Sequence, residues 1–261
     1  MNADDAAGPS IQVHVAGSVI SVRIDAPNKV NAISPSMLQD LETVVTNPPA
    51  APEGSVLILS GRPGIFSAGA NLPDVAALGS EEWMAFLEQI QRVCDLIAEL
   101  PLPTIASIDG PCIGLAAEIA LACDFRIASD RATLAWPEVT VGLPCPVRQL
   151  TQYLSKPRVV DLVLTGRMVP ADEALALGLL TQVTEGEGLE SATAAYARSL
   201  TGRSPIAVGA TKKGLVDLGG APVSRNGSFF TASARARDSS QFRAAVNRLK
   251  PRSGDPATAP E

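Results

Sequence analysis

The segment Thr104–Ser129, TIASIDGPCIGLAAEIALACDFRIAS, is the one around which the predicted fold is organised. Two short apolar runs, Thr104–Ile108 and Phe125–Ala128, flank a longer apolar run that begins at about Gly114. A segment that is hydrophobic on every side belongs in the interior of a domain rather than on its surface. The pattern therefore predicts a strand, a turn at 109–111, a buried helix and a second strand at the centre of the protein.

One carboxylate, Glu118, lies within the apolar helix. An ionised carboxylate is costly to bury without a partner, and its pKa usually rises in response. Glu118 is also about one turn from the expected helix start, where unpaired backbone N–H groups and the helix dipole favour negative charge. The stretch therefore fits a site at which an anion forms and a proton moves. The plainer alternative is a glutamate that hydrogen-bonds a neighbouring loop or faces a subunit boundary.

The composition favours one large domain, or one domain with a smaller appendage. The chain has 261 residues, 46% of them hydrophobic, and a net charge of −6, which is enough apolar material for a core. The negative charge disfavours a nucleic-acid or anionic-membrane surface. No apolar run reaches spanning length, and the first residues are acidic where a signal peptide would be basic. We therefore expect a cytoplasmic protein with no nucleic-acid or membrane partner.

The residue counts exclude several kinds of chemistry. His14 is the single histidine and lies in an alternating segment, IQVHV, so we expect it on a strand surface. A histidine-rich metal site is therefore impossible, and a Ser-His-Asp or Cys-His mechanism would have to rest on His14. The four cysteines show no CxxC spacing, and we expect reduced, buried thiols. Neither nucleotide-binding fingerprint occurs. Carboxylates and backbone amides remain as the catalytic candidates, with no metal and no redox cofactor.

Strands and helices are expected to alternate through the first two thirds of the chain. The sequence predicts a hairpin at 11–15 and 19–24, strands at 56–60 and near 180–183, and helices from Ser34–Pro35, from Ser80, and at about 147–154, 157–164, 171–177, 189–200, 205–218 and 223–249. Residues 1–9 are expected to be a disordered tip and 251–261 a flexible tail. The helix from Ser80 carries one apolar stripe, which we interpret as core first and as a pocket wall second. Its members are Trp83, Phe86, Leu87, Ile90, Val93, Leu96 and Ile97.

Two further segments are candidates for a site. The loop GRPGIFSAGANLPDV, 61–75, leaves little side-chain bulk after a strand, so main-chain N–H groups could approach a ligand closely. An ordinary glycine-rich turn is the plainer interpretation. The loop is not a GxSxG nucleophile elbow, because Ile65 stands where the first glycine should be, so Ser67 is not expected to be a nucleophile. Glu138, after Trp136 and Pro137, is a second carboxylate among apolar residues.

Four motifs resemble, in order and spacing, the enoyl-CoA hydratase/isomerase (crotonase) superfamily over about residues 10–250. They are NKVNAIS (Asn28–Ser34), GIFSAGANL (Gly64–Leu72), IDGPCIGLAAEIALACDFRIAS (Ile108–Ser129) and WPEVTVGLP (Trp136–Pro144). The resemblance implies an α/β fold: a crotonase-type spiral of ββα units at 10–200 and a helical C-terminal trimerisation region at 201–250. It also implies a homotrimer or dimer of trimers, and an acyl-CoA thioester substrate in which coenzyme A is the carrier.

The resemblance assigns roles to individual residues. The oxyanion hole would be the backbone N–H groups of Ala70 and Leu115. Glu118 falls at the position of the glutamate that holds water, and Glu138 at the position of the glutamate that serves the α-carbon. The expected coenzyme A contacts are Lys29, Ala32, Ser67, Ala68, Ala70, Asn71 and Leu72.

The pair of glutamates, twenty residues apart, matches the hydratase branch, whereas isomerases and several other branches typically lack one of them. The expected activity is therefore that of an enoyl-CoA hydratase, a lyase of fatty-acid metabolism. Addition of water to a 2-enoyl thioester places negative charge on the thioester oxygen, which two preorganised amides would stabilise, and it moves protons, which two carboxyl groups could do.

Three departures from the family pattern affect specificity. Asn71 replaces an aspartate, Leu115 replaces a glycine, and Leu143–Leu150, LPCPVRQL, lacks the paired glycines usual there. Alternatives within the family are an isomerase, a decarboxylase, a carbon–carbon lyase or an inactive homologue that binds coenzyme A or a carrier. A two-carboxylate glycosidase is disfavoured by an aromatic content of 4%.

Overall fold

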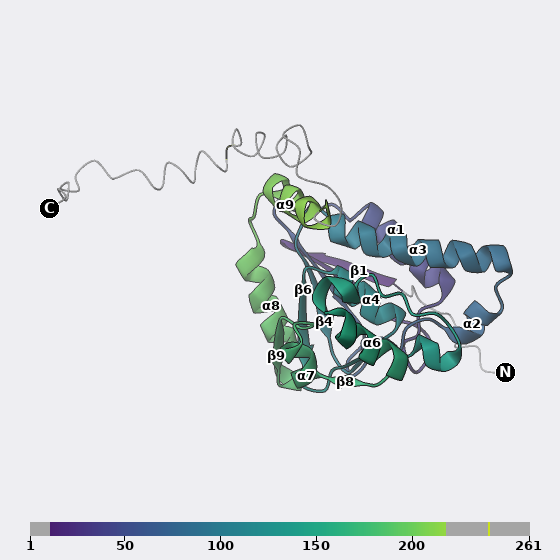
Figure 1. Ribbon diagram of the computed structural model, residues 1–261. Coiled ribbons are helices and arrows are strands. Elements are labelled where there is room, and N and C mark those ends of the chain that lie inside the picture. The colour runs from purple at the N-terminus through teal and green to yellow at the C-terminus, as the bar shows by residue number, and fades with distance from the viewer. Residues whose placement is uncertain (1–10, 218–239, 241–261) are drawn as a thin grey trace, which may run out of the picture.

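The centre of the fold is a six-stranded sheet in the order β1-β2-β3-β4-β6-β9. The strands are β1 (Ile11–Ala16), β2 (Val19–Ile24), β3 (Val56–Ser60), β4 (Thr104–Ile108), β6 (Phe125–Ser129) and β9 (Gln182–Thr184). β1 and β2 form the predicted antiparallel hairpin, with His14 exposed, and the other neighbouring strands are parallel. This computed structural model describes residues 11–217 and residue 240 (Figure 1).

A second, three-stranded sheet lies beside the site. It consists of β5 (Pro111–Ile113), β7 (Thr133–Ala135) and β8 (Val169–Pro170), with β5 parallel and β8 antiparallel to β7. None of these strands was predicted, because two or three residues are too few to show an alternating pattern. The turn expected at 109–111 runs directly into β5, so its last residue belongs to a strand.

Helices cover both faces of the main sheet. They are α1 (Pro35–Thr46), α2 (Leu72–Ala76), α3 (Ser80–Glu99), α4 (Leu115–Ala122), α5 (Leu150–Tyr153), α6 (Lys156–Thr165), α7 (Ala171–Ala176), α8 (Leu189–Leu200) and α9 (Pro205–Asp217), with 3-10 turns η1 (Glu138–Val141) and η2 (Gly186–Gly188). Alternate residues of β3 show the two faces: Val56 packs in a small core under α8, whereas Leu57 packs in the main core with α1, α3 and α4. Figure 1 shows α8 on the left, away from α1 and α3.

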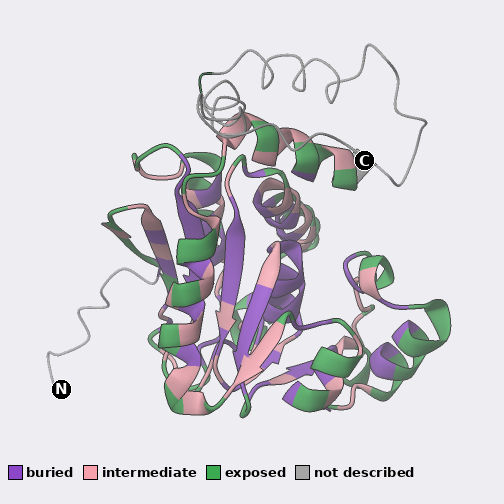
Figure 2. Ribbon diagram, turned by 90° about the vertical axis from the view of Figure 1, so that its left-hand side faces the viewer, coloured by how far each residue is buried: buried purple, intermediate pink, exposed green. Residues whose placement is uncertain are grey.

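The buried residues gather in the strands and on the helix sides that face them (Figure 2). All eight residues of α4 are buried, as the apolar stretch predicts. α1 begins as expected, since the Ser34 hydroxyl accepts a hydrogen bond from the Met37 amide at 3.2 Å. The α/β class predicted from the sequence is confirmed.

Two predicted elements are shorter or shifted. The helix expected at 147–154 is only α5, because the hydrogen bonding before Leu150 is irregular: the Thr151 amide bonds to the Val147 carbonyl at 3.0 Å, but the Gln152 amide bonds to the Gln149 carbonyl at 3.1 Å. The strand expected at 180–183 begins two residues later, because the Leu179 and Leu180 amides bond to the Ala174 carbonyl and close the end of α7. The predicted helix at 223–249, the tip at 1–9 and the tail at 251–261 lie outside the described residues.

α9 is attached to the rest of the molecule by a buried lysine. Lys212 is 6% exposed, and its Nζ donates to the carboxylate of Asp124 at 2.8 Å and to the carbonyls of Ile97 and Leu102 at 3.3 and 3.1 Å. The same carboxylate oxygen of Asp124 accepts hydrogen bonds from the amide and the hydroxyl of Thr104. One lysine therefore joins α9 to the end of α3 and to the start of β4 and β6.

Candidate active site

A cavity of about 450 Å³ opens between α3, α2 and its preceding loop, the N-terminus of α4 and the segment 137–146. Four polar residues line it: Asn28, Asn71, Glu118 and Glu138. The remaining lining residues are apolar or glycine. A concave, mostly apolar site with a few convergent polar groups is typical of a small-molecule pocket.

The N-terminal half of α3 forms one wall of the cavity. Trp83, Phe86, Leu87 and Ile90 line it, and the rings of Trp83 and Phe86 lie with centroids 6.0 Å apart. The C-terminal half of the same stripe, with Val93 and Ile97 buried, packs in the main core. The stripe predicted from the sequence therefore serves both purposes: it packs in the core along its length, and its N-terminal half also forms the cavity wall.

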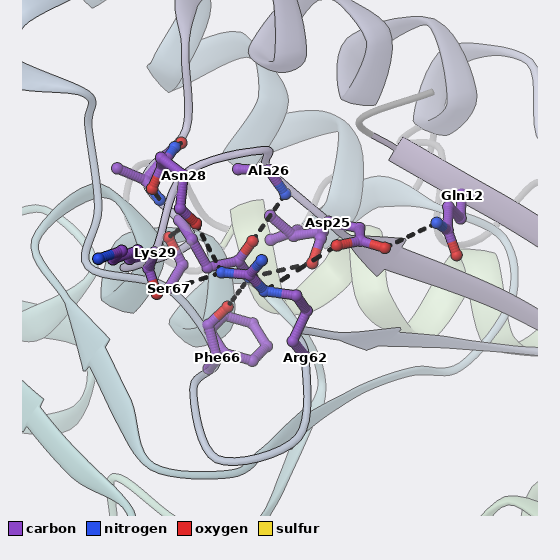
Figure 3. A network of polar contacts seen from close by, with 11 residues as sticks. Gln12, Asp25, Ala26, Asn28, Lys29, Arg62, Phe66 and Ser67 are labelled. Atoms are coloured by element: carbon purple, nitrogen blue, oxygen red, sulfur yellow. Dashed lines mark hydrogen bonds and ion pairs between the residues drawn. The ribbon is translucent and has the colours of Figure 1, made fainter. Parts of the chain in front are cut away.

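A buried asparagine ties the loop after β2 to the loop after β3. The Asn31 side chain accepts a hydrogen bond from the Ala26 amide at 2.8 Å and donates to the Ile24 and Phe66 carbonyls at 3.0 and 2.7 Å. Its backbone lies in the left-handed region at φ 53°, which asparagine tolerates better than most residues. The Ser67 hydroxyl donates to the Asn31 carbonyl at 2.7 Å and accepts from the Gly69 amide at 3.1 Å. These bonds hold the 61–70 loop against its neighbour (Figure 3).

Two backbone amides in the cavity wall are free to donate. Ile33 bonds to the residues on either side of Ala70, donating to Gly69 at 2.7 Å and accepting from Asn71 at 2.8 Å, so the Ala70 amide is not used in that pairing. Leu115 is the first residue of α4, where N–H groups have no partner within the helix. Within residues 11–217, neither the Ala70 nor the Leu115 amide donates a hydrogen bond, and both residues line the cavity.

Glycine at position 69 lets the loop that carries Ala70 approach the turn that carries Leu115. A Cβ atom on Gly69 would lie 2.5 Å from the Ile113 carbonyl oxygen and 3.4 Å from the Leu115 nitrogen. The first distance is far below van der Waals contact, so a side chain here would force the strand of Ile113 away. Glycine at position 69 therefore lets the loop pack closely against the turn before α4, whereas the approach of its N–H groups to a ligand stays a prediction.

Glu118 lies in the first turn of α4 with no exposed surface. Its Oε1 accepts a hydrogen bond from the indole N–H of Trp136 at 2.9 Å, and its Oε2 has no hydrogen-bond partner among the described residues. Burial raises the pKa of Glu118 to about 8, with the Trp136 hydrogen bond opposing the rise and the charge of Glu138 adding to it. The raised pKa anticipated from the sequence is therefore found, and the group is suited to exchanging a proton near neutral pH.

Glu138, the first residue of η1, lies against the turn that starts α4. A Cβ atom on Gly114 would be 2.8 Å from Glu138 Oε1, so the carboxyl group lies against this turn, and the backbone at φ 55° and ψ −121° favours glycine there. Glu138 is half-buried, and its Oε2 has no hydrogen-bond partner in the described part of the chain. Burial raises its pKa, with its own backbone amide and the Cys145 thiol opposing the rise.

The structure brings most of the predicted site residues to this one cavity. Those that line it are Ala32, Ala68, Ala70, Asn71, Leu72, Leu115, Glu118 and Glu138. Lys29 and Ser67 are outside the lining. Lys29 is exposed on its loop and Ser67 is fully buried, with its hydroxyl engaged as described. A part in binding coenzyme A stays a prediction for all of the residues named for it, inside and outside the lining.

The replacement at Asn71 has a local explanation. Its side-chain amide donates to the Asp74 carboxylate at 2.6 Å, at the start of α2. An ionised aspartate at position 71 would repel Asp74 instead of donating to it. Asparagine at position 71, where the family usually has aspartate, is therefore compatible with the neighbouring carboxylate of Asp74.

Sequence reasoning missed the part of Trp136. It considered Glu118 and Glu138 but gave no role to the tryptophan two residues before the second of them. The available signal was a large aromatic residue in a buried segment, since a buried indole N–H usually finds an acceptor. Leu143, Pro144 and Pro146 of the segment LPCPVRQL line the cavity, and the expected effect of this departure on specificity stays a prediction.

Within the part of the chain that the structure describes, no three His, Cys, Asp or Glu side chains gather as a metal site would require. In the same part, no helix is both long and apolar enough to span a membrane.

Comparisons with known proteins agree with this geometry. The model of the enoyl-CoA hydratase/isomerase family matches residues 14–219. Over 201 residues the chain is 33% identical to an enoyl-CoA isomerase/hydratase of Mycosarcoma maydis, covering 72% of this chain and 73% of the relative. It is 33% identical over 185 residues to the mitochondrial enoyl-CoA hydratase domain-containing protein 3 of Danio rerio, covering 70% and 64%. The solved enoyl-CoA hydratase of Bacillus anthracis superposes with a TM-score of 0.80 at 26% identity, covering 92% of this chain and 95% of that one. The fold is of the crotonase type, and the chain belongs to the enoyl-CoA hydratase/isomerase family.

Proposed function

We propose that the protein is an enoyl-CoA hydratase that adds water across the double bond of a 2-enoyl thioester. The observation that carries the proposal is the meeting of two kinds of group in one cavity. Among the described residues, Glu118 and Glu138 each have a carboxyl oxygen without a hydrogen-bond partner, and the Ala70 and Leu115 amides are free to donate. Hydration needs both kinds of group, one for the protons and the other for the charge.

The proposed reaction assigns one step to each group. The thioester oxygen accepts hydrogen bonds from the Ala70 and Leu115 amides. Ionised Glu118 takes a proton from water as the water oxygen attacks Cβ, and the electron pair of the double bond moves toward the thioester oxygen as an enolate. Protonated Glu138 then delivers a proton to Cα, which gives the 3-hydroxyacyl thioester. Each amide would contribute about 3 kcal/mol to the stabilisation of the enolate, as oxyanion-hole donors do elsewhere.

The lining of the cavity supports an apolar acyl group as the substrate. Apart from two asparagines and the two glutamates, the lining is hydrocarbon, aromatic or glycine, and the described residues that form it include no lysine, arginine or histidine. A carboxylate on the acyl chain would lose its hydration and meet two acidic groups, which is unfavourable. The Trp83 and Phe86 rings and the Leu115 side chain give such a chain an apolar surface to contact.

The experiment is a panel of CoA thioesters. With a straight-chain 2-enoyl-CoA, the absorbance of the conjugated enoyl thioester should fall, and mass spectrometry should show a product heavier by one water. Glu118→Gln and Glu138→Gln should each slow the change by at least about a hundredfold. Glu173→Gln, which removes an ion pair with Arg167 outside the cavity, should not slow it. No product from any 2-enoyl-CoA in the panel would refute the proposal.

The same panel should include 3-enoyl-CoA substrates, because the Mycosarcoma maydis relative is named both isomerase and hydratase. A rise in the conjugated absorbance with these substrates, without hydration of 2-enoyl-CoA, would assign isomerisation instead. A 2-enoyl chain that carries a terminal carboxylate tests the apolar requirement, and we expect it to be a poorer substrate than its uncharged counterpart.

A further inference from the structure

Trp136 is the largest fully buried side chain among the described residues and lies immediately after β7. Its single polar atom is a donor, and that donor is directed to Glu118 Oε1 at 2.9 Å. The other carboxyl oxygen of Glu118, Oε2, has no partner in residues 11–217. The indole therefore distinguishes two oxygens that are otherwise chemically equal.

Resting on the proposed hydratase function, we propose that Trp136 is a positioning residue for Glu118. Its indole N–H fixes Oε1, leaves Oε2 as the oxygen that receives the proton of water, and stabilises the ionised form that the reaction needs. Nothing in the proposed chemistry requires Trp136 to touch the substrate.

The position of Trp136 is fixed by the backbone on both sides. The carbonyl of Ala135, the preceding residue, accepts a hydrogen bond from the Gly114 amide at 2.8 Å. Gly114 is the residue before Leu115, so the strand end that carries the indole is bonded to the turn that carries the proposed oxyanion amide. Pro137 follows with φ −87° and leads to Glu138. A shift of Trp136 would therefore disturb both the orientation of Glu118 and the turn beside it.

The groups around Glu118 explain why this hydrogen bond matters. Three titratable side chains face its carboxyl group: Glu138 from η1, Cys94 from α3 and Cys145 from the loop after η1. Burial raises the pKa of both thiols above their usual value, so they stay neutral, and the Glu138 charge opposes ionisation of Glu118. Within residues 11–217, Trp136 is the one side chain that donates a hydrogen bond to Glu118. A hydrogen bond to an ionised acceptor is roughly twice as strong as one to a neutral acceptor, so it lowers the pKa of Glu118.

The direct test uses the indole as a reporter in the substrate-free protein. The sequence contains two tryptophans, so protein labelled with ¹⁵N-indole gives two indole N–H signals, and Trp136→Phe assigns them. Between about pH 5 and about pH 10, the Trp136 proton should move downfield as Glu118 ionises, and this titration should vanish in Glu118→Gln. A Trp136 signal that does not titrate, or that titrates equally in Glu118→Gln, would overturn the proposal. This measurement does not depend on which reaction the enzyme catalyses.

The kinetic test separates positioning from a merely structural role. In Trp136→Phe the acidic limb of the kcat/KM profile should move to higher pH by about one unit, so activity falls about tenfold at neutral pH and recovers in alkaline buffer. In a Glu118→Gln background the same substitution should cause no further loss, because the group that Trp136 serves is gone. A uniform loss at every pH, or an equal loss in both backgrounds, would show that Trp136 only fills space. If the indole titrates but no 2-enoyl-CoA is hydrated, the proposed function fails while the pairing stands.

Discussion

Replacing Glu118 with glutamine should stabilise the protein increasingly as the pH rises. The glutamine amide would retain an oxygen to accept the Trp136 hydrogen bond, and it carries no charge to bury. Glu118 has a pKa of about 8 in the folded protein against an ordinary value of 4.5. Between these values the folded state keeps a proton that the unfolded state releases, so each pH unit weakens the wild-type fold by about 1.4 kcal/mol.

The size of the effect follows from the two pKa values. Below pH 4.5 the carboxyl group is protonated in both states and contributes no difference. Above about pH 8 it is ionised in both states, and the accumulated difference is on the order of 5 kcal/mol. For a chain of this size, that corresponds to a gap of about 10 to 20 °C in Tm between Glu118→Gln and the wild type in alkaline buffer.

The assay is a series of thermal melts from about pH 5 to about pH 9 on both proteins. Glu173→Gln is the matched control, because Glu173 binds Arg167 and its pKa is lowered by that guanidinium. The Glu173–Arg167 pair contributes its full stability above the ordinary carboxyl pKa of 4.5 and loses it only at lower pH, so the gap between Glu173→Gln and wild type should stay constant over this pH range. A gap between Glu118→Gln and wild type that stays constant or narrows with rising pH would refute the reasoning about burial.

Three other outcomes are expected. Glu138→Gln should lower kcat by at least about a hundredfold without lowering the melting temperature, as general acid–base groups do; near-wild-type turnover would remove Glu138 from the mechanism. Leu115→Pro should abolish turnover in a protein whose circular dichroism is unchanged, because it deletes a donor at a helix position that tolerates proline, whereas Leu115→Gly should keep hydration and accept bulkier acyl groups. Gly69→Ala should lower kcat more than it raises KM, because the added Cβ would lie 2.5 Å from the Ile113 carbonyl oxygen and displace the turn before Leu115. A kcat equal to that of wild type would show that the loop relaxes without moving the Ala70 and Leu115 amides.

The main sheet and the buried α4 were predictable because their signals are long and local. Strands of five or six apolar residues and a helix without a polar face can be recognised from one stretch of chain. The strands β5, β7 and β8 were not predictable, because each is two or three residues long and exists only through pairing with distant segments. The same distinction explains α5, because a helix of four residues has almost no periodicity to recognise.

In the candidate site, too, features set by neighbouring residues were predictable from the sequence, and contacts between distant segments were not. Glu118 could be identified as unusual from its apolar neighbours, and its raised pKa follows from them. The partner of Glu118 could not, because Trp136 is eighteen residues away in sequence and its indole reaches the carboxyl group only through the pairing of β7 with β5. The proximity of Glu138 to Gly114 likewise depends on the 3-10 turn η1, which no sequence pattern predicted.

The buried Lys212 gives α9 an electrostatic attachment that hydrophobic packing alone would not provide. Removing α9, or cutting the chain before residue 205, would leave the Asp124 carboxylate without its counter-charge, with the Thr104 amide and hydroxyl as its remaining donors. It would also uncover the Ile97 and Leu102 carbonyls beside the end of α3. The opposite end of that same helix holds Trp83 and Phe86 against the cavity. The hydrogen bond from Lys212 to the Ile97 carbonyl thus holds one end of α3, and the other end of α3 forms the cavity wall, so we expect the shape of the pocket to depend on a lysine that lies outside it.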